Sequence, residues 1–177
     1  MAKVIILNAP AGCGKDTIAK LLVAEGYEVE EFKSPMFDVA VALSGQTRQE
    51  FMLDYNDREA KEAPQARLGG LSYREFMIKI SEEWAKPLLG NSVFGSLASN
   101  SCNRKRNVVF SDGGFIDEVN YLVSAGHDVT VVRMHRLGFT FEGDSRNYIY
   151  PESCRSFDIN LIDNFPERAV EEIMMSI

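Results

Sequence analysis

The chain has 177 residues, a formal net charge of −7 at pH 7 and a hydrophobic content of 45%. These values are typical of one globular domain with a sizeable core, and they argue against a broad basic face that binds duplex DNA. No apolar run approaches the ~20 residues of a membrane span, so we expect no membrane partner. The cysteines are scattered without metal-ligand spacing, and the chain starts without a signal-peptide pattern, which favours a reduced, cytoplasmic protein.

The first candidate site lies near the start of the chain, where an apolar run at residues 4–7 leads into a glycine-containing segment at residues 8–17 and then into a helical pattern. Strand, glycine-rich turn, Gly-Lys and helix is the layout of a phosphate-binding P-loop. Glycine allows left-handed backbone angles, and the N–H groups of such a turn attract anions beside the positive end of the helix dipole. We therefore predict that the phosphates of ATP are bound by Ala11, Gly12, Cys13, Gly14, Lys15, Asp16 and Thr17.

This segment departs from the usual G-x-x-x-x-G-K-[ST] pattern. Ala9 stands in place of the first glycine, Asp16 stands in place of the hydroxyl that binds Mg²⁺, and Thr17 follows one residue late. Mg²⁺ could therefore be held by Thr17, by Asp16 through a water, or by both. The alternative interpretation is a tight strand-to-helix turn in which Asp16 caps the helix. Lys15 is predicted to place its charge against the β- and γ-phosphates.

The middle third of the chain is predicted to be helical, after a short second strand at residues 28–32. Ser72 is a typical helix N-cap, and Glu75 follows it at the spacing of a capping box. The helix that begins there carries an apolar residue at every fourth position, which predicts that its core-facing side chains are Phe76, Ile80, Trp84 and Leu88. We expect residues 36–104 to form a mostly helical insert within a single domain that covers residues 1–177.

The last third of the chain alternates strands with helices. The predicted strands are the apolar runs at residues 107–112, 128–134 and 157–162. With the helical patterns at residues 115–125 and 166–175, they predict an α/β fold in which helices cover both faces of a parallel sheet. Ligands of such folds lie at the carboxyl ends of the strands. The connection at residues 135–151 is long for a loop without a function, and we expect it to be a lid.

Asp112 ends a buried strand, as the carboxylate of a Walker B strand does. In phosphoryl transfer such a carboxylate holds Mg²⁺ or orients the acceptor hydroxyl, and the alternative is that it caps the following helix. The transferred group also needs positive charge, and the arginines Arg133, Arg136 and Arg146 flank or lie within the predicted lid. We predict that the catalytic residues are Lys15, Asp112, Arg136 and Arg146. The predicted Mg²⁺ ligands are Asp16, Thr17 and Asp112.

For the acceptor site we consider the helical insert, because basic residues are few in this acidic chain. Arg74 lies in the first turn of the long helix, whereas Arg58 and Lys61 lie in a polar stretch that could equally be a solvated charged face. Phe37 could stack on a base, although an aromatic residue at such a position is more often part of a core.

Several of these segments resemble the phage deoxynucleoside monophosphate kinases. Residues 14–17 (GKDT) are similar to their P-loop, and residues 32–36 (FKSPM) resemble their F-A-x-P-L-K acceptor segment, except that Phe37 stands where the lysine would be. Residues 74–77 (REFM) resemble the start of their arginine-led helix, residues 144–146 (DSR) their D-S-H lid segment, and residues 163–164 (DN) their late asparagine. The resemblance implies a P-loop kinase sheet of about five strands in the order 2-3-1-4-5, with ATP and Mg²⁺ as cofactors. We predict that the acceptor is bound by Ser34, Phe37, Arg58 and Arg74.

Residues 133–146 and residues 111–115 (SDGGF) look more like the phage P-loop kinases of thymidine hypermodification, members of which phosphorylate 5-hydroxymethyluracil already in DNA. The missing lysine favours this acceptor, whereas the acidic net charge disfavours DNA. We expect a kinase of hydroxymethyluracil in phage DNA, acting in the cytoplasm of an infected bacterial host. The alternative is a deoxynucleoside monophosphate kinase, and the non-enzyme alternative is an NTP-binding regulatory module. The sequence leaves the oligomeric state open, with a homodimer among the options.

Overall fold

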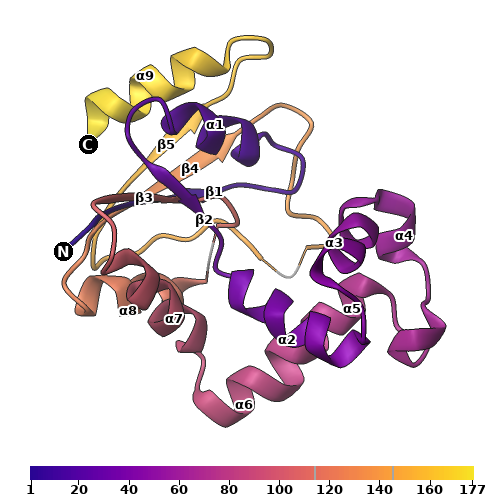
Figure 1. The fold of residues 1–177 in the computed structure, drawn as a ribbon. Coiled ribbons are helices and arrows are strands. Elements are labelled where there is room, and N and C mark those ends of the chain that lie inside the picture. Colours follow the sequence, from indigo (N-terminus) through magenta and orange to yellow (C-terminus); the bar gives the residue numbers. More distant parts are fainter. Residues whose placement is uncertain (114, 145) are drawn as a thin grey trace. The chain divides into compact units, whose positions relative to one another are not determined.

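The computed structural model describes residues 1–113, 115–144 and 146–177 (Figure 1). Contacts within the chain define two compact units, of which one comprises Met1–Phe32 and Phe94–Ile177 and the other comprises Lys33–Val93. Each unit has a hydrophobic core of its own. The expected single domain with an insert at residues 36–104 stays a prediction.

The first unit is built on a parallel sheet that has five strands among the described residues (Figure 1). The strands are β1 Lys3–Asn8, β2 Glu28–Glu30, β3 Asn107–Phe110, β4 Asp128–His135 and β5 Arg155–Asn160. They lie in the order β2-β3-β1-β4-β5. The predicted α/β fold and its strand order are therefore confirmed, with β2 shorter than expected and β5 beginning two residues earlier than the pattern indicated.

Strand β1 lies in the middle of the sheet. Ile5 pairs with Val109 of β3 on one side and with Thr130 of β4 on the other. Every residue of β1 after Lys3 is buried, as expected for a parallel strand that is covered on both faces. Because Asn8 ends this strand, the predicted P-loop begins at a well-anchored point of the fold.

Helices cover both faces of this sheet. They are α1 Lys15–Leu22, α7 Val93–Cys102, α8 Ile116–Ser124 and α9 Pro166–Ser176. Helices α1 and α9 pack on the face where Ile5 and Leu7 are buried, whereas α7 and α8 pack on the face where Val4 and Ile6 are buried (Figure 1). This alternation follows from the two-residue period of a strand, and it gives three layers with the sheet in the middle.

The second unit is helical throughout. Its elements are α2 Ser34–Ser44, α3 Arg48–Asn56, α4 Arg58–Glu62, the 3₁₀ helix η1 Ala66–Leu68, α5 Tyr73–Ile78, the π-helix η2 Lys79–Ala85 and α6 Lys86–Leu89. The predicted capping box is confirmed, because Ser72 and Glu75 bond each other's backbone N–H groups. The core of this unit includes Phe37, Phe51 and Tyr73. Among the described residues, no helix is both long and apolar enough to cross a bilayer.

The predicted core stripe of the long helix is wrong at its second half. Ile80 is 5% exposed, but Trp84 is 51% and Leu88 is 67% exposed. The reason is the π-helical stretch Lys79–Ala85, in which each turn takes in more residues than an α-turn does. After Ile80, the next buried hydrophobic residue of this stretch is Ala85, five positions on, so the inward-facing position lies one residue past Trp84.

A buried histidine ties the start of β1 to the other elements of the first unit. His127 is 5% exposed, its Nδ1 accepts a hydrogen bond from the Ala2 N–H at 3.3 Å, and its Nε2 lies 3.0 Å from the Ser99 hydroxyl. Because Nδ1 accepts, the ring is neutral and Nε2 carries the proton. Burial lowers the pKa of His127 below its usual value of 6.5.

This depressed pKa predicts a loss of stability in acid. The contribution of His127 should be fully present above pH ~6.5 and should be lost as the pH falls through the folded-state pKa, because the unfolded chain binds the proton more readily. The slope cannot exceed about 1.4 kcal/mol per pH unit for one proton. Urea unfolding between pH 5 and 8 should show this slope in the wild type and not in His127→Gln. Identical pH profiles for the two proteins would contradict the prediction.

Candidate active site

The loop between β1 and α1 has the backbone geometry that the sequence predicts. Gly12 has a φ of 75° and Gly14 a φ of 113°, both in the left-handed region that favours glycine. Gly14 is the N-cap of α1 and offers no side chain to that end of the helix. The first N–H groups of α1 therefore meet the loop without a side-chain cap from the N-cap residue, which suits the binding of an anion.

Lys15 directs its charge into this loop. It is 9% exposed, and its ammonium donates hydrogen bonds to the carbonyl oxygens of Ala9 at 2.6 Å and Pro10 at 2.8 Å. Burial lowers the pKa of Lys15, and the nearby positive charge of Arg146 lowers it further. The ammonium is thus a compact cation at the rim of the loop, close to a second cation.

Arg146 bonds the backbone just after β3 and a neighbouring carboxylate. Its Nη1 donates to the backbone oxygen of Asp112 at 2.8 Å, while Nε and Nη2 donate to the two carboxylate oxygens of Asp144 at 3.1 Å and 3.0 Å. Burial raises the pKa of Asp144, but the hydrogen bonds from Arg146 outweigh it and hold this pKa below its usual value. The structure therefore brings three predicted catalytic residues, Lys15, Asp112 and Arg146, to one place, together with Asp144.

The carboxylate of Asp112 connects neighbouring strand ends. Its Oδ1 accepts from the N–H of Phe32 at 3.1 Å, just after β2, and Glu118 supplies the carboxylate that caps Phe115 N–H at the start of α8. Gly113, which follows, has a φ of 53°, and a Cβ on it would lie 2.6 Å from the Leu7 oxygen. The ends of β1 and β3 can approach this closely because residue 113 has no side chain.

Two other arginines, which flank or lie within the predicted lid, are paired with carboxylates. Arg133 is 5% exposed and donates to both oxygens of Asp158 at 2.9 and 2.7 Å, and this contact is the main reason why the pKa of Asp158 falls to about 2. Arg136 donates to Asp163 at 2.8 Å and lies over the ring of Phe139. The predicted catalytic role of Arg136 stays a prediction.

Cys13 contributes its backbone to the loop while its side chain is buried. It is 0% exposed, and its Sγ lies 3.6 Å from the Met134 oxygen as a weak donor. Burial raises the pKa of the Cys13 thiol above its usual value. The N–H of Cys13 donates to the Pro10 oxygen at 3.3 Å, and the predicted role of Cys13 in binding phosphate stays a prediction.

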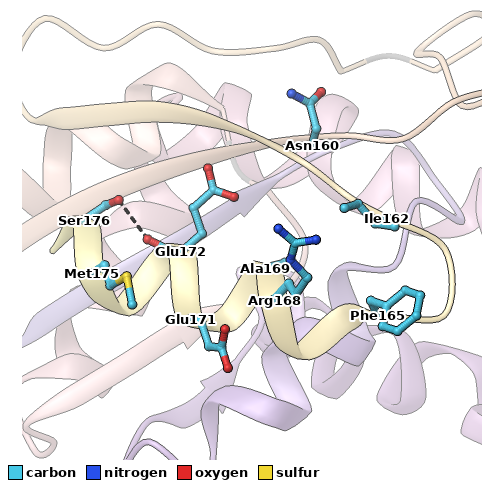
Figure 2. A pocket seen from close by; sticks show the side chains of 9 residues that line it. All are labelled: Asn160, Ile162, Phe165, Arg168, Ala169, Glu171, Glu172, Met175 and Ser176. Atoms are coloured by element: carbon cyan, nitrogen blue, oxygen red, sulfur yellow. Dashed lines mark hydrogen bonds between the residues drawn. The ribbon is translucent and has the colours of Figure 1, made fainter.

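Among the described residues of the first unit, one cavity lies beside the loop and another lies away from it. The one beside the loop has a volume of about 200 Å³ and is lined by residues of the loop, α1, Arg136 and the segment after β5, among them Thr17 and Asn164. The other, of about 270 Å³, lies between α9 and the end of β5 and is lined by Phe165, Arg168, Glu172 and their neighbours (Figure 2). No residue of the loop lines the larger cavity. The smaller cavity, which loop residues do line, is therefore the better candidate for the nucleoside part of a ligand.

The residues available for Mg²⁺ are few. No group of three or more His, Cys, Asp or Glu side chains that could hold a metal is found in the described parts of the chain. Asp16 and Thr17 are exposed in the first turn of α1, and Asp112 lies two residues after β3. This set suits Mg²⁺, which keeps several waters and takes one or two protein ligands beside substrate phosphates. Their assignment as metal ligands stays a prediction.

The predicted acceptor residues belong to the second unit. Ser34 begins α2, and Phe37 is buried in the helical core with 2% exposure. Arg58 is exposed at the start of α4, and the Arg74 guanidinium lies 2.7 Å from the Glu62 carboxylate. Their role in acceptor binding stays a prediction. Gly114 and Ser145, which belong to segments used for the family resemblance, lie outside the described residues.

Sequence reasoning missed two residues of the first unit that contact this site. The carboxylate of Asp144 accepts hydrogen bonds from Nε and Nη2 of Arg146. Asn8 Oδ1 accepts from the N–H of Ile149, three residues after that arginine. Asp144 holds Arg146 itself, whereas Asn8 holds the backbone of Asn147 and Ile149, which follow that arginine. The one local signal was the Asx-type spacing of Asp144 and Arg146, since the N–H of Arg146 donates to Asp144 Oδ1 at 3.0 Å.

Comparisons with known proteins bear on the fold. No family model matches the chain, and no curated protein matches it. A candidate kinase from Chloroflexus aurantiacus superposes with a TM-score of 0.52 and 11% identity over 99% of this chain and 98% of that one.

Two further solved structures give lower scores. An unliganded sugar kinase from Janibacter sp. HTCC2649 has a TM-score of 0.45 with 14% identity, over 99% of this chain and 94% of its own. A dephospho-CoA kinase from Campylobacter jejuni has a TM-score of 0.46 with 10% identity, over 99% and 96%. Together with the strand order, the likeness to the Chloroflexus protein gives the chain a P-loop kinase fold, and it leaves the phage resemblance as a prediction.

The geometry of Lys15 predicts an anion site that a single substitution weakens. Lys15→Met should lower the affinity for inorganic tripolyphosphate by about 10-fold or more, because one charged hydrogen-bond donor is lost. The fold should persist, since the ammonium bonds only loop carbonyls. Calorimetric titration measures the affinity, and Lys20→Met, exposed on the same helix, is the control. Equal affinity of Lys15→Met and wild type would make the loop a structural turn.

Proposed function

We propose that the chain is an ATP-dependent phosphotransferase. The observation that carries this proposal is that the Lys15 ammonium bonds the left-handed loop before α1, while Arg146, whose charge acts on Lys15, bonds the backbone of Asp112 two residues after β3. Phosphoryl transfer requires positioning and positive charge around three equatorial oxygens more than it requires covalent chemistry. The P-loop kinase fold supports the same reaction class.

In this proposal ATP lies along the loop with its phosphates at the start of α1. The nucleoside part occupies the cavity of about 200 Å³, where the planar Arg136 guanidinium, held by Asp163, can stack on a base. Asp16, Thr17 and Asp112 would hold Mg²⁺, which neutralises charge on the β- and γ-phosphates.

The chain's own side chains then divide the work around the γ-phosphoryl group. Lys15 and Arg146 place positive charge against the oxygens on which charge develops. The carboxylate of Asp144 holds the Arg146 fork in this structure, so an incoming phosphate competes with it for the same N–H groups. Asp112 orients the acceptor hydroxyl or serves the metal.

The acceptor that we propose is the hydroxymethyl group of 5-hydroxymethyluracil in DNA. The resemblance of residues 133–146 supports it, and so does the missing lysine after residues 35–36, because Phe37 is buried in the helical core and offers no cation for a free 5′-phosphate. A base in a duplex cannot reach a P-loop, so the substrate would be single-stranded or rotated out of the stack.

A deoxynucleoside monophosphate is the alternative acceptor. The net charge of −7 favours it, since an acidic protein attracts a polyanion weakly, and the GKDT loop resembles that of the monophosphate kinases. The non-enzyme alternative is an NTP-binding module, which would bind ATP without turning it over.

A panel of acceptors distinguishes these functions. We expect label transfer from γ-labelled ATP to hydroxymethyluracil DNA and none to thymine DNA. Single strands should be used better than duplexes, and affinity should fall steeply with salt. Efficient phosphorylation of a free monophosphate, without transfer to modified DNA, would select the alternative. ATP binding with no turnover on any acceptor would select the non-enzyme module.

Asp112→Asn tests the chemistry at the end of β3. The amide keeps the size of the side chain and an acceptor for the Phe32 N–H, but it removes the negative charge. We expect kcat to fall on the order of 10²-fold or more while KM for ATP changes less. Asp117→Asn, exposed in the first turn of α8, is the matched control. An unchanged kcat would leave Asp112 with a structural role only.

A further inference from the structure

Asn8 is a buried polar residue at the end of β1 that the proposed chemistry does not use. It is 1% exposed, its Nδ2 donates to the Asn147 oxygen at 3.2 Å, and its Oδ1 accepts from the Ile149 N–H at 2.9 Å. A carbonyl can only accept and an N–H can only donate, so the two contacts fix which way the amide points. The Asn8 side chain thus binds the backbone of the segment that follows Arg146.

The same backbone is held from the neighbouring strand. Arg133 is the register partner of Asn8 across β1 and β4, and its Nη1 donates to the Ile149 oxygen at 3.2 Å. Arg133 is in turn the register partner of Asp158 on β5, which binds its guanidinium. Residues at one level of three adjacent strands therefore hold both the N–H and the C=O of Ile149.

This hold lies one peptide away from Arg146. The oxygen that Asn8 binds belongs to Asn147, the residue next to Arg146, whose guanidinium reaches Asp112 and lies near Lys15. Gly113 leaves room for the contact, because a Cβ on it would lie 3.1 Å from the Asn8 Cα and 3.5 Å from its Nδ2. Strand β1, which leads into the P-loop, thereby also fixes the position of the backbone next to Arg146.

We infer that Asn8 is a positioning residue, which holds the backbone at residues 147–149 so that Arg146 faces the phosphates bound at Lys15. Asn8 does not touch the substrate, because it is buried and its amide groups are engaged with the backbone. The part of this inference that concerns catalysis rests on the proposed phosphotransferase activity. The part that concerns the hold on the backbone does not.

The first measurement is hydrogen exchange at the Ile149 amide, which is independent of any activity. Asn8→Ala removes the acceptor and should speed this exchange, whereas Asn8→Asp keeps an acceptor oxygen and should preserve most of the protection while losing the donor to Asn147. Asn160→Ala is the control, because it removes an exposed asparagine side chain at the end of β5 and leaves both contacts of Asn8 in place. Unchanged exchange in Asn8→Ala would overturn the inference. If Asn8→Ala does not fold, Asn8→Leu carries the same test, because it fills the site and also removes the acceptor for the Ile149 N–H.

The second measurement is a double-mutant cycle between Asn8 and Arg146. If Asn8 acts through Arg146, Asn8→Ala should lower kcat by about 10-fold in the wild-type background. In the Arg146→Ala background, Asn8→Ala should change kcat by less than about twofold. A general structural defect would instead lower kcat by the same factor in both backgrounds. Equal losses in both backgrounds would overturn the inference, and so would faster exchange with unchanged kcat.

The proposed function and this inference fail in different ways. If the wild type phosphorylates no acceptor, the proposed function is wrong, and the same cycle is then measured on tripolyphosphate affinity. Non-additive losses of affinity, with the faster Ile149 exchange, would still support the positioning role. Additive losses, or none, would overturn it.

Discussion

The buried ammonium of Lys15 is the constraint around which the loop between β1 and α1 is arranged. A cation at 9% exposure must be compensated, and the carbonyl oxygens of Ala9 and Pro10 do this only if the loop turns back over the start of α1. That turn requires left-handed backbone angles at Gly12 and Gly14. It also requires a fixed starting point, which β1 supplies by pairing on both sides. The position of the Lys15 charge therefore depends on the central place of β1 in the sheet.

The arginines around the site are held by carboxylates rather than by solvent alone. Arg133, Arg136 and Arg146 come from one stretch of chain, but each pairs with its own acid, at Asp158, Asp163 and Asp144. The pairing of Arg133 is structural, since that side chain is buried and grips the backbone at Ile149. Arg146 differs because its electrostatic neighbour is Lys15. Three similar residues in a sequence thus acquire different roles through their partners.

Local patterns predicted the fold well and the site in part. The parallel α/β arrangement, the P-loop turn and the Ser72 capping box follow from periodicity and from residues close in sequence, whereas the strand order was implied by the family resemblance. The contact between Asn8 and Ile149 spans 141 residues, and no local pattern carries such information. The exposure of Trp84 was missed for another reason, because a π-helical stretch changes the period on which the prediction relied. The roles of the arginines needed the tertiary structure, since any of them could have faced phosphate.

The cysteine within the loop has a consequence for the protein's response to oxidants. Only the thiolate of a cysteine reacts readily with peroxides, disulfides and alkylating reagents. The Cys13 thiol is buried, its pKa is raised by that burial, and its sulfur is turned towards Met134 in the sheet. A phosphate-binding loop that contains a cysteine would ordinarily be exposed to redox inactivation. In this chain the thiol is packed as a small apolar side chain, so we expect reagents that modify accessible thiols to leave Cys13 unmodified.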